Sequence, residues 1–371
     1  MTKPAEQVAA TPEVLFIRPE VRAIRAYRLR QPSGAIRLHQ NEAPGDWPEA
    51  IKREVADRLL AVPWHRYPQA RAEAVCEALG LLQGTPSSMI AATAGSNEAL
   101  WAAFAATAAR GTVVMPSPTY SMAKTLALAA GARVVEVPLG DAFALNADAV
   151  LRAAHAHRAE AIYLASPNNP TGNVLAREGV AAVLAGAPGA VILDEAYWEF
   201  TGTTWLEAVS RYPQLLVVRT FSKAMAGAGL RVGWITAQAQ VIGELLKVLP
   251  PYSLNVFAQV TTPVLVAHRD VAESRVRTIG AERGRVAAGL QALGVRVYPS
   301  ETNFLLFEPG FPPADVWQRL ADRGVLVRDV SAAPQLAGCL RVSISAPDDN
   351  DRFLAGMAAA IADLRREPRR T

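Results

Sequence analysis

The strongest constraint on the fold is an alternation of short apolar runs with helix-like stretches between about residues 88 and 236. Each run is rich in valine, isoleucine or leucine, as expected for strands that are buried on both faces. The six runs lie at residues 112–115, 133–137, 161–165, 190–193, 215–219 and 232–236. Alternating strands and helices predict an α/β domain on a mainly parallel sheet. Such sheets bind ligands beyond the carboxyl ends of their strands, so a site is expected there.

The pattern changes after about residue 255, where a long arginine-bearing helix is predicted at 271–293. Short strands and two more helices follow it, which indicates a small α+β domain. Its strands are predicted at 295–298, 303–307, 325–328 and 340–345, and its helices at 313–323 and 350–365. We therefore predict three parts. They are an N-terminal segment (1–35) that packs on the small domain, a large domain (36–255) and a small domain (256–371).

Composition excludes several classes of protein. No apolar run reaches the roughly 18 residues that a membrane helix needs, and the N-terminal residues are too polar for a signal peptide, so a cytoplasmic location is expected. The formal net charge is only +4 and the basic residues are scattered, so neither nucleic acid nor a membrane is an expected partner. Cys76 and Cys339 are far apart, and His155 and His157 do not share a helix face, so no metal site is predicted.

Lys223 carries the strongest chemical signal. It is one of only five lysines among 38 basic residues, and it follows an apolar run and enters a segment rich in glycine and alanine. Small neighbours permit the close approach of a cofactor, and desolvation lowers a lysine pKa and so favours the nucleophilic amine. Ser222 and Arg231 nearby could bind a phosphate. A solvated lysine in a surface loop is the alternative.

Two further motifs follow buried runs. Asp194 ends one run and could pair with a protonated pyridine nitrogen, although it could equally cap a helix. Tyr197, three residues later, could donate to the phenolic oxygen of the same ring. Asn169 lies in a tight turn with Pro170 and Gly172 and offers an amide to that oxygen, but a turn alone requires no function.

Two weaker motifs lie earlier in the chain. Gly95 precedes a predicted helix whose first turn carries Ser96 and Asn97, and free amides at a helix start can bind phosphate. Tyr120 ends a proline-rich loop and could stack on a flat cofactor, or it could be an ordinary packed tyrosine.

Together, these five motifs resemble those of fold-type I aminotransferases that depend on pyridoxal 5'-phosphate (PLP), and most closely the histidinol-phosphate aminotransferase family. The resemblance extends from about residue 21 to 363. It implies that Lys223 forms a Schiff base with PLP and carries protons, while Asp194 pairs with the pyridine nitrogen. The other implied PLP contacts are Tyr197 and Asn169 at the phenolic oxygen, Ser96, Asn97, Ser222 and Arg231 at the phosphate, and Tyr120 against the ring.

The resemblance also implies a homodimer with shared active sites, because Tyr67 matches a tyrosine that reaches the PLP phosphate of the neighbouring subunit. Four residues match substrate-binding positions. They are Arg341 for an acidic group such as a carboxylate, Arg328 and Tyr27 for a substrate phosphate, and Asn41 in an Asn-Glu signature. Ala43 departs from that signature, and the 45–48 segment is unusual, which leaves the amino acceptor open.

The implied reaction transfers an amino group from histidinol phosphate to 2-oxoglutarate. Two alternatives use the same scaffold, an aromatic amino-acid aminotransferase and a lyase such as threonine-phosphate decarboxylase. A PLP-binding regulator without catalysis is a third alternative, but no helix-turn-helix extension is found before the α/β region.

Overall fold

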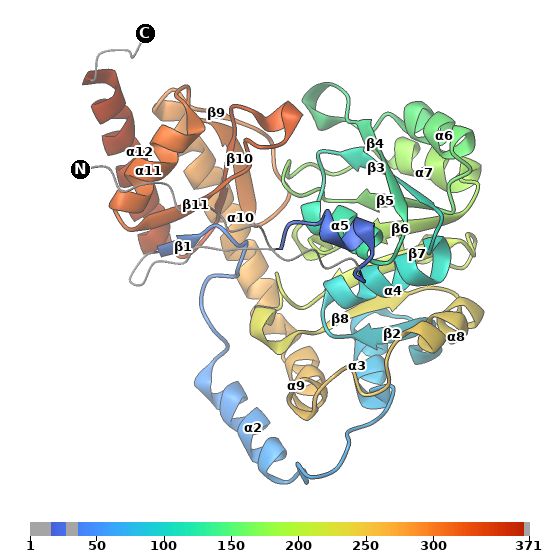
Figure 1. The fold of residues 1–371 in the computed structure, drawn as a ribbon. Coiled ribbons are helices and arrows are strands. Elements are labelled where there is room, and N and C mark those ends of the chain that lie inside the picture. The colour runs from blue at the N-terminus through green and yellow to red at the C-terminus, as the bar shows by residue number, and fades with distance from the viewer. Residues whose placement is uncertain (1–15, 27–35, 367–371) are drawn as a thin grey trace.

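The computed structural model describes residues 16–26 and 36–366, which form two sheets with helices packed around them (Figure 1). The larger sheet has seven strands in the order β2-β8-β7-β6-β5-β3-β4. Its strands are β2 (Ile90–Thr93), β3 (Thr112–Ser117), β4 (Arg133–Pro138), β5 (Ala161–Ala165), β6 (Ala190–Asp194), β7 (Leu215–Thr220) and β8 (Gly233–Thr236). The pairs among β3 to β7 are parallel, whereas β8 is antiparallel to both of its neighbours.

Helices cover both faces of this sheet. One face packs against α4 (Ser96–Ala108), α5 (Ser121–Ala129) and α8 (Ala239–Val248), and the other against α6 (Ala147–Ala156) and α7 (Arg177–Gly186). Successive strand residues point to opposite faces, so Tyr163 lies in the first core and its neighbours Ile162 and Leu164 lie in the second. A third cluster joins α2 (Glu49–Leu60), α3 (Glu73–Gln83) and α9 (Val256–Ala267).

The smaller sheet has the order β1-β11-β12-β10-β9. Its strands are β1 (Ile36–Leu38), β9 (Arg296–Val297), β10 (Phe304–Glu308), β11 (Val325–Asp329) and β12 (Leu340–Ser343). An apolar core lies between this sheet and the helices α10 (Arg269–Ala292), α11 (Pro313–Asp322) and α12 (Pro347–Arg366). Figure 1 shows this unit beside the larger sheet, with α10 running between the two.

The six apolar runs predicted as strands are all strands, and the sheet is mainly parallel, as predicted. The reversed direction of β8 was not predicted. It follows from the link after β7, because residues 221–232 contain no crossover helix of the kind that a parallel connection requires.

The N-terminal part is placed differently from our expectation. The described residues 16–26 include α1 (Pro19–Arg22), which contacts α5 of the larger domain, and Arg18 Nη2 donates to the Ala129 carbonyl at 2.6 Å. For residues 16–26, the prediction that they pack on the small domain is therefore wrong. β1 pairs with β11 in the smaller sheet although it falls within the range predicted for the large domain. The remaining domain boundaries stay a prediction.

None of the helices within residues 16–26 and 36–366 combines the length and apolar character needed to span a bilayer.

Candidate active site

A cavity of about 890 Å³ lies between the strand ends of the larger sheet and one face of the smaller sheet. It brings together twelve of the fourteen site residues predicted from the sequence. These are Asn41, Ser96, Asn97, Tyr120, Asn169, Asp194, Tyr197, Ser222, Lys223, Arg231, Arg328 and Arg341. Tyr67 lies elsewhere, 82% exposed and stacked on Tyr252 with ring centroids 4.6 Å apart. Tyr27 lies outside the described residues.

Asp194 ends β6 at the floor of the cavity and is 5% exposed. Tyr163 Oη donates to its Oδ2 at 3.0 Å, and the backbone amide of Ala196 donates to Oδ1 at 3.0 Å. Burial raises the pKa of Asp194 to about 6, although both hydrogen bonds oppose the rise. A cationic partner would hold this carboxyl group in its ionised form, which suits it to a protonated ring nitrogen.

Lys223 enters the cavity from the loop after β7. Its Nζ donates to the carbonyl oxygens of Gln40 at 3.2 Å and Asn41 at 3.1 Å. Burial lowers the pKa of Lys223 to about 7, and the positive charge of Arg341 lowers it further. A substantial neutral fraction of the amine is thus present near neutral pH, as a nucleophile or proton carrier requires.

Asn41 joins the two domains at the edge of the cavity. Its Nδ2 donates to Tyr197 Oη at 2.9 Å, and its Oδ1 accepts from Ser343 Oγ at 3.2 Å. Burial raises the pKa of Tyr197 to about 12, so this phenol keeps its proton as a donor at neutral pH. Both ends of the Asn41 amide are engaged by protein groups, and the substrate contact expected for Asn41 stays a prediction.

A cradle for a tetrahedral anion lies at the start of α4. The first residues of this 13-residue helix line the cavity together with Ser222 and Arg231, and Arg231 Nη1 donates to Ser222 Oγ at 3.5 Å. Gly95 has φ +83°, a backbone conformation that L side chains rarely adopt, so this turn before α4 favours glycine. Tyr120 Oη donates to Asn97 Oδ1 at 3.1 Å and lies beside this cradle.

Arg328 and Arg341 line the cavity from the smaller sheet, directly opposite each other on β11 and β12. Arg341 is 8% exposed, donates from Nη1 to Asn169 Oδ1 at 2.5 Å, and donates from Nη2 to the His39 carbonyl at 2.9 Å. Two like charges paired across strands repel each other, so an anionic ligand between them is favoured. This side of the cavity therefore suits an acidic substrate group.

Two residues were missed in the sequence, Tyr163 behind Asp194 and His39 in the cavity lining. Tyr163 occupies the middle of an apolar run, where an aromatic residue is typical of a core, and its hydroxyl is the only sign of a polar role. His39 directly precedes the Gln40–Asn41 segment that contacts Lys223, and its imidazole is 4% exposed. The one signal in the sequence that could have indicated His39 was its position directly before this segment.

Comparison with known proteins defines the class. The family description "Aminotransferase class I and II" matches residues 33–356, so the chain belongs to this family and is a PLP-dependent aminotransferase of fold-type I. A histidinol-phosphate aminotransferase of Thermococcus kodakarensis is 38% identical, over 92% of this chain and 97% of that protein. Histidinol-phosphate aminotransferase 2 of Cupriavidus pinatubonensis is 36% identical, over 94% and 97%.

A solved structure shows the same fold. Histidinol-phosphate aminotransferase from Sinorhizobium meliloti, in complex with pyridoxal-5'-phosphate, superposes with a TM-score of 0.84. It covers 96% of this chain and all of that one, at 23% sequence identity.

The residues that line the cavity suit the chemical groups of PLP. The cradle of Ser96, Ser222 and Arg231 suits the phosphate, and the buried carboxyl group of Asp194 suits the ring nitrogen. When bound, PLP supplies an electron sink for the electrons left when a proton leaves the amino-bearing carbon. Lys223, with its lowered pKa, is placed to take and return that proton at Nζ, and Tyr197 to donate from its phenol.

Proposed function

We propose that this enzyme transfers the amino group of histidinol phosphate to 2-oxoglutarate, giving imidazole acetol phosphate and glutamate. The observation that carries the proposal is the facing pair of Arg328 and Arg341 in the same cavity as the phosphate cradle. The relatives named histidinol-phosphate aminotransferase support the same substrate.

The chemistry of the two substrates explains why two arginines are needed. Histidinol phosphate has a dianionic phosphate and no α-carboxylate, whereas glutamate carries two carboxylates. Both must use one cavity in turn. Arg341 is fixed by Asn169 and the His39 carbonyl and suits the carboxylate, while Arg328, on the neighbouring strand, supplies a second cationic group for phosphate.

The test is kcat/KM of wild type and Arg328→Ala with histidinol phosphate and with phenylalanine as amino donors. A hydrogen bond to a charged group contributes about 1.5–3 kcal/mol, so Arg328→Ala should lose at least about tenfold with histidinol phosphate. Phenylalanine should be affected much less, because it has no phosphate. Arg296→Ala, which changes an exposed arginine of the same sheet, is the control and should match wild type.

Three outcomes would contradict the proposal. They are a wild-type preference for phenylalanine, unchanged turnover of histidinol phosphate by Arg328→Ala, and release of carbon dioxide without a keto acid. The first favours an aromatic aminotransferase, the second removes the role of Arg328 in binding the substrate phosphate, and the third favours a decarboxylase.

We further propose that the enzyme is a homodimer with shared active sites and that it is cytoplasmic. Large apolar side chains are exposed along α2, α3, α9 and the loops beside them. They are Leu60, Trp64, Tyr67, Leu81, Tyr252 and Phe257, with exposures of 42–82%. An exposed apolar surface of this kind is typical of a subunit interface. Tyr67 lies within it, which supports a role in the partner's site.

A further inference from the structure

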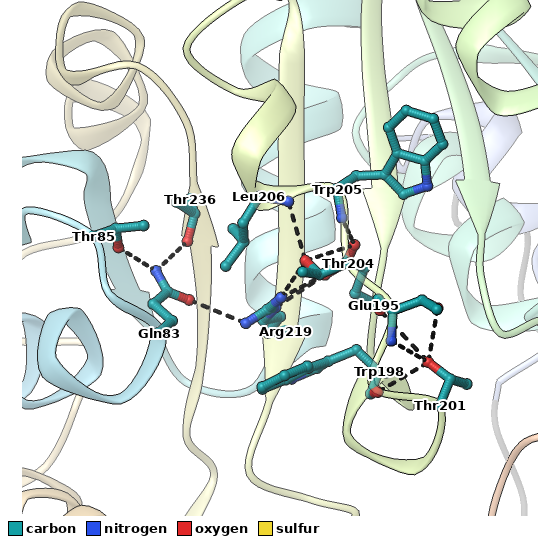
Figure 2. A network of polar contacts seen from close by, with 12 residues as sticks. Gln83, Thr85, Glu195, Trp198, Thr201, Thr204, Trp205, Leu206, Arg219 and Thr236 are labelled. Carbon is teal, nitrogen blue, oxygen red and sulfur yellow. Dashed lines mark hydrogen bonds and ion pairs between the residues drawn. The ribbon is translucent and has the colours of Figure 1, made fainter. Parts of the chain in front are cut away.

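A buried polar network lies around Arg219 of β7, whose side chain is fully buried (Figure 2). Its Nε and Nη2 donate to Glu195 Oε2 at 3.1 and 2.7 Å, and Nη2 also donates to Thr204 Oγ1 at 2.6 Å. The guanidinium lies 3.9 Å from the centre of the Trp198 ring. Arg219 therefore holds the segment after β6 from several directions.

Gln83, at the end of α3, extends the network to β8 (Figure 2). Its Oε1 accepts from Arg219 Nη1 at 3.4 Å and from Trp234 Nε1 at 3.0 Å. Its Nε2 donates to Thr85 at 2.7 Å and to Thr236 at 2.9 Å. The network thus connects the end of α3 with β7, β8 and the segment after β6.

No side chain of the network lines the cavity, so the network reaches the active site through the backbone and through the charge of Glu195, which adds to burial in raising the pKa of Asp194. Glu195 directly follows Asp194, and its backbone amide donates to the Val218 carbonyl at 2.8 Å. Asp194 lines the cavity, whereas the Glu195 side chain is 1% exposed, does not line the cavity and binds Arg219. Arg219 also precedes Lys223 by four residues. The pair therefore holds the adjoining ends of β6 and β7, which carry the two central groups of the site.

Stability alone does not explain a charged pair at this place. A buried ion pair often contributes no more to stability than well-packed apolar side chains of similar volume, because both charges lose their hydration. The pair does fix geometry, since the planar guanidinium donates in set directions.

We propose that Arg219 is a positioning residue that acts through Glu195 to hold the Asp194 carboxylate toward the ring nitrogen of PLP. Arg219 does not line the cavity. Loss of the pair lets the backbone at residues 194–195 rotate, which weakens the contact between Asp194 and the ring nitrogen.

The test separates positioning from stability with the double variant Arg219→Met/Glu195→Leu, which leaves no charge unpaired. Its melting temperature should lie near that of wild type, whereas Arg219→Met alone should melt lower because Glu195 is left without its partner. The double variant should still bind PLP at least about tenfold more weakly, as expected when a hydrogen bond to a charged group is lost. The pH at which the absorbance of bound PLP changes should also shift.

Arg177→Met is the matched control. Arg177 also forms an ion pair, with Glu207, and lies over a tryptophan ring, but its side chain is 58% exposed and it does not line the cavity. It should leave PLP affinity and absorbance unchanged. Wild-type PLP affinity and absorbance in a folded double variant would overturn the proposal. If the double variant does not fold, Arg219→Lys replaces it: a shifted absorbance pH supports positioning, and an unchanged one overturns it.

Discussion

His39 is a buried residue whose imidazole has no hydrogen-bond partner among the residues that the structure describes. Burial lowers the pKa of His39 to about 4, and the positive charges of Arg328, Arg341 and Arg37 lower it further. The folded protein therefore binds fewer protons at this residue than the unfolded chain between about pH 4 and pH 6.5. The contribution of His39 to the free energy of unfolding is therefore fully present above about pH 6.5 and is lost as the pH falls toward 4.

The first prediction is that His39→Leu removes this loss. A leucine side chain does not titrate, so the variant should gain stability relative to wild type by about 2 kcal/mol more at pH 5 than at pH 7.5. Urea denaturation at the two pH values measures the difference. His157→Leu, at an exposed position, is the control and should show no such gain. An equal effect of His39→Leu at both pH values would contradict the shifted pKa.

At the scale of elements, the phosphate cradle depends on how closely β8 packs against the start of α4. Gly233 of β8 pairs with Thr93 of β2 and with Thr220 of β7. The segment that follows Thr93 and the segment that follows Thr220 therefore lie close together. A Cβ atom on Gly233 would collide with the backbone of Gly95 and Ser96. The absent side chain therefore sets the position of the helix that supplies free amides to the phosphate.

The second prediction is that Gly233→Ala displaces the start of α4 and weakens PLP binding. Loss of one hydrogen bond to a charged phosphate corresponds to at least about a tenfold higher dissociation constant. Titration of the cofactor-free protein with PLP measures this. Gly243→Ala on the exposed face of α8 is the control, because a Cβ there meets no atom within 4 Å, and it should raise stability without changing affinity. Unchanged affinity in Gly233→Ala would show that the helix start does not depend on this contact.

The sequence predicts elements best where local pattern decides the structure. The apolar runs were sufficient to place β3 to β7, and the residues that follow them, Asp194 and Lys223, meet in one cavity. Pairing between distant segments was not predictable, because no local pattern encodes it. The pairing of β1 with β11 is of this kind, whereas the antiparallel direction of β8 follows from the short link after β7, which is visible in the sequence.

The same limit applies to the site. The apolar run around Tyr163 indicates a core residue, and its contact with Asp194 forms only when β5 and β6 lie side by side. Likewise, the Arg219–Glu195 pair joins residues 24 positions apart that become neighbours only in the sheet.

At the scale of the whole molecule, Tyr67 is the one predicted site residue, among those that the structure describes, that does not line the cavity of its own chain. It is 82% exposed, stacks on Tyr252 and lies among exposed apolar residues. A two-fold symmetric interface places the same surface of each subunit against the other, so a residue on that surface can complete the partner's site. The proposed dimer thus predicts that each site takes Lys223 from one subunit and Tyr67 from the other.

The third prediction is complementation between inactive variants. Lys223→Ala and Tyr67→Ala should each be strongly impaired, but an equal mixture after subunit exchange should regain about one quarter of wild-type activity. Half of the dimers are then mixed, and each mixed dimer has one site with both residues intact. A mixture of Lys223→Ala with Asp194→Ala is the control and should stay inactive, because both residues belong to the same chain's cavity and no mixed dimer has an intact site. No recovery with Tyr67→Ala, despite subunit exchange demonstrated by mass spectrometry, would place Tyr67 outside the partner's active site.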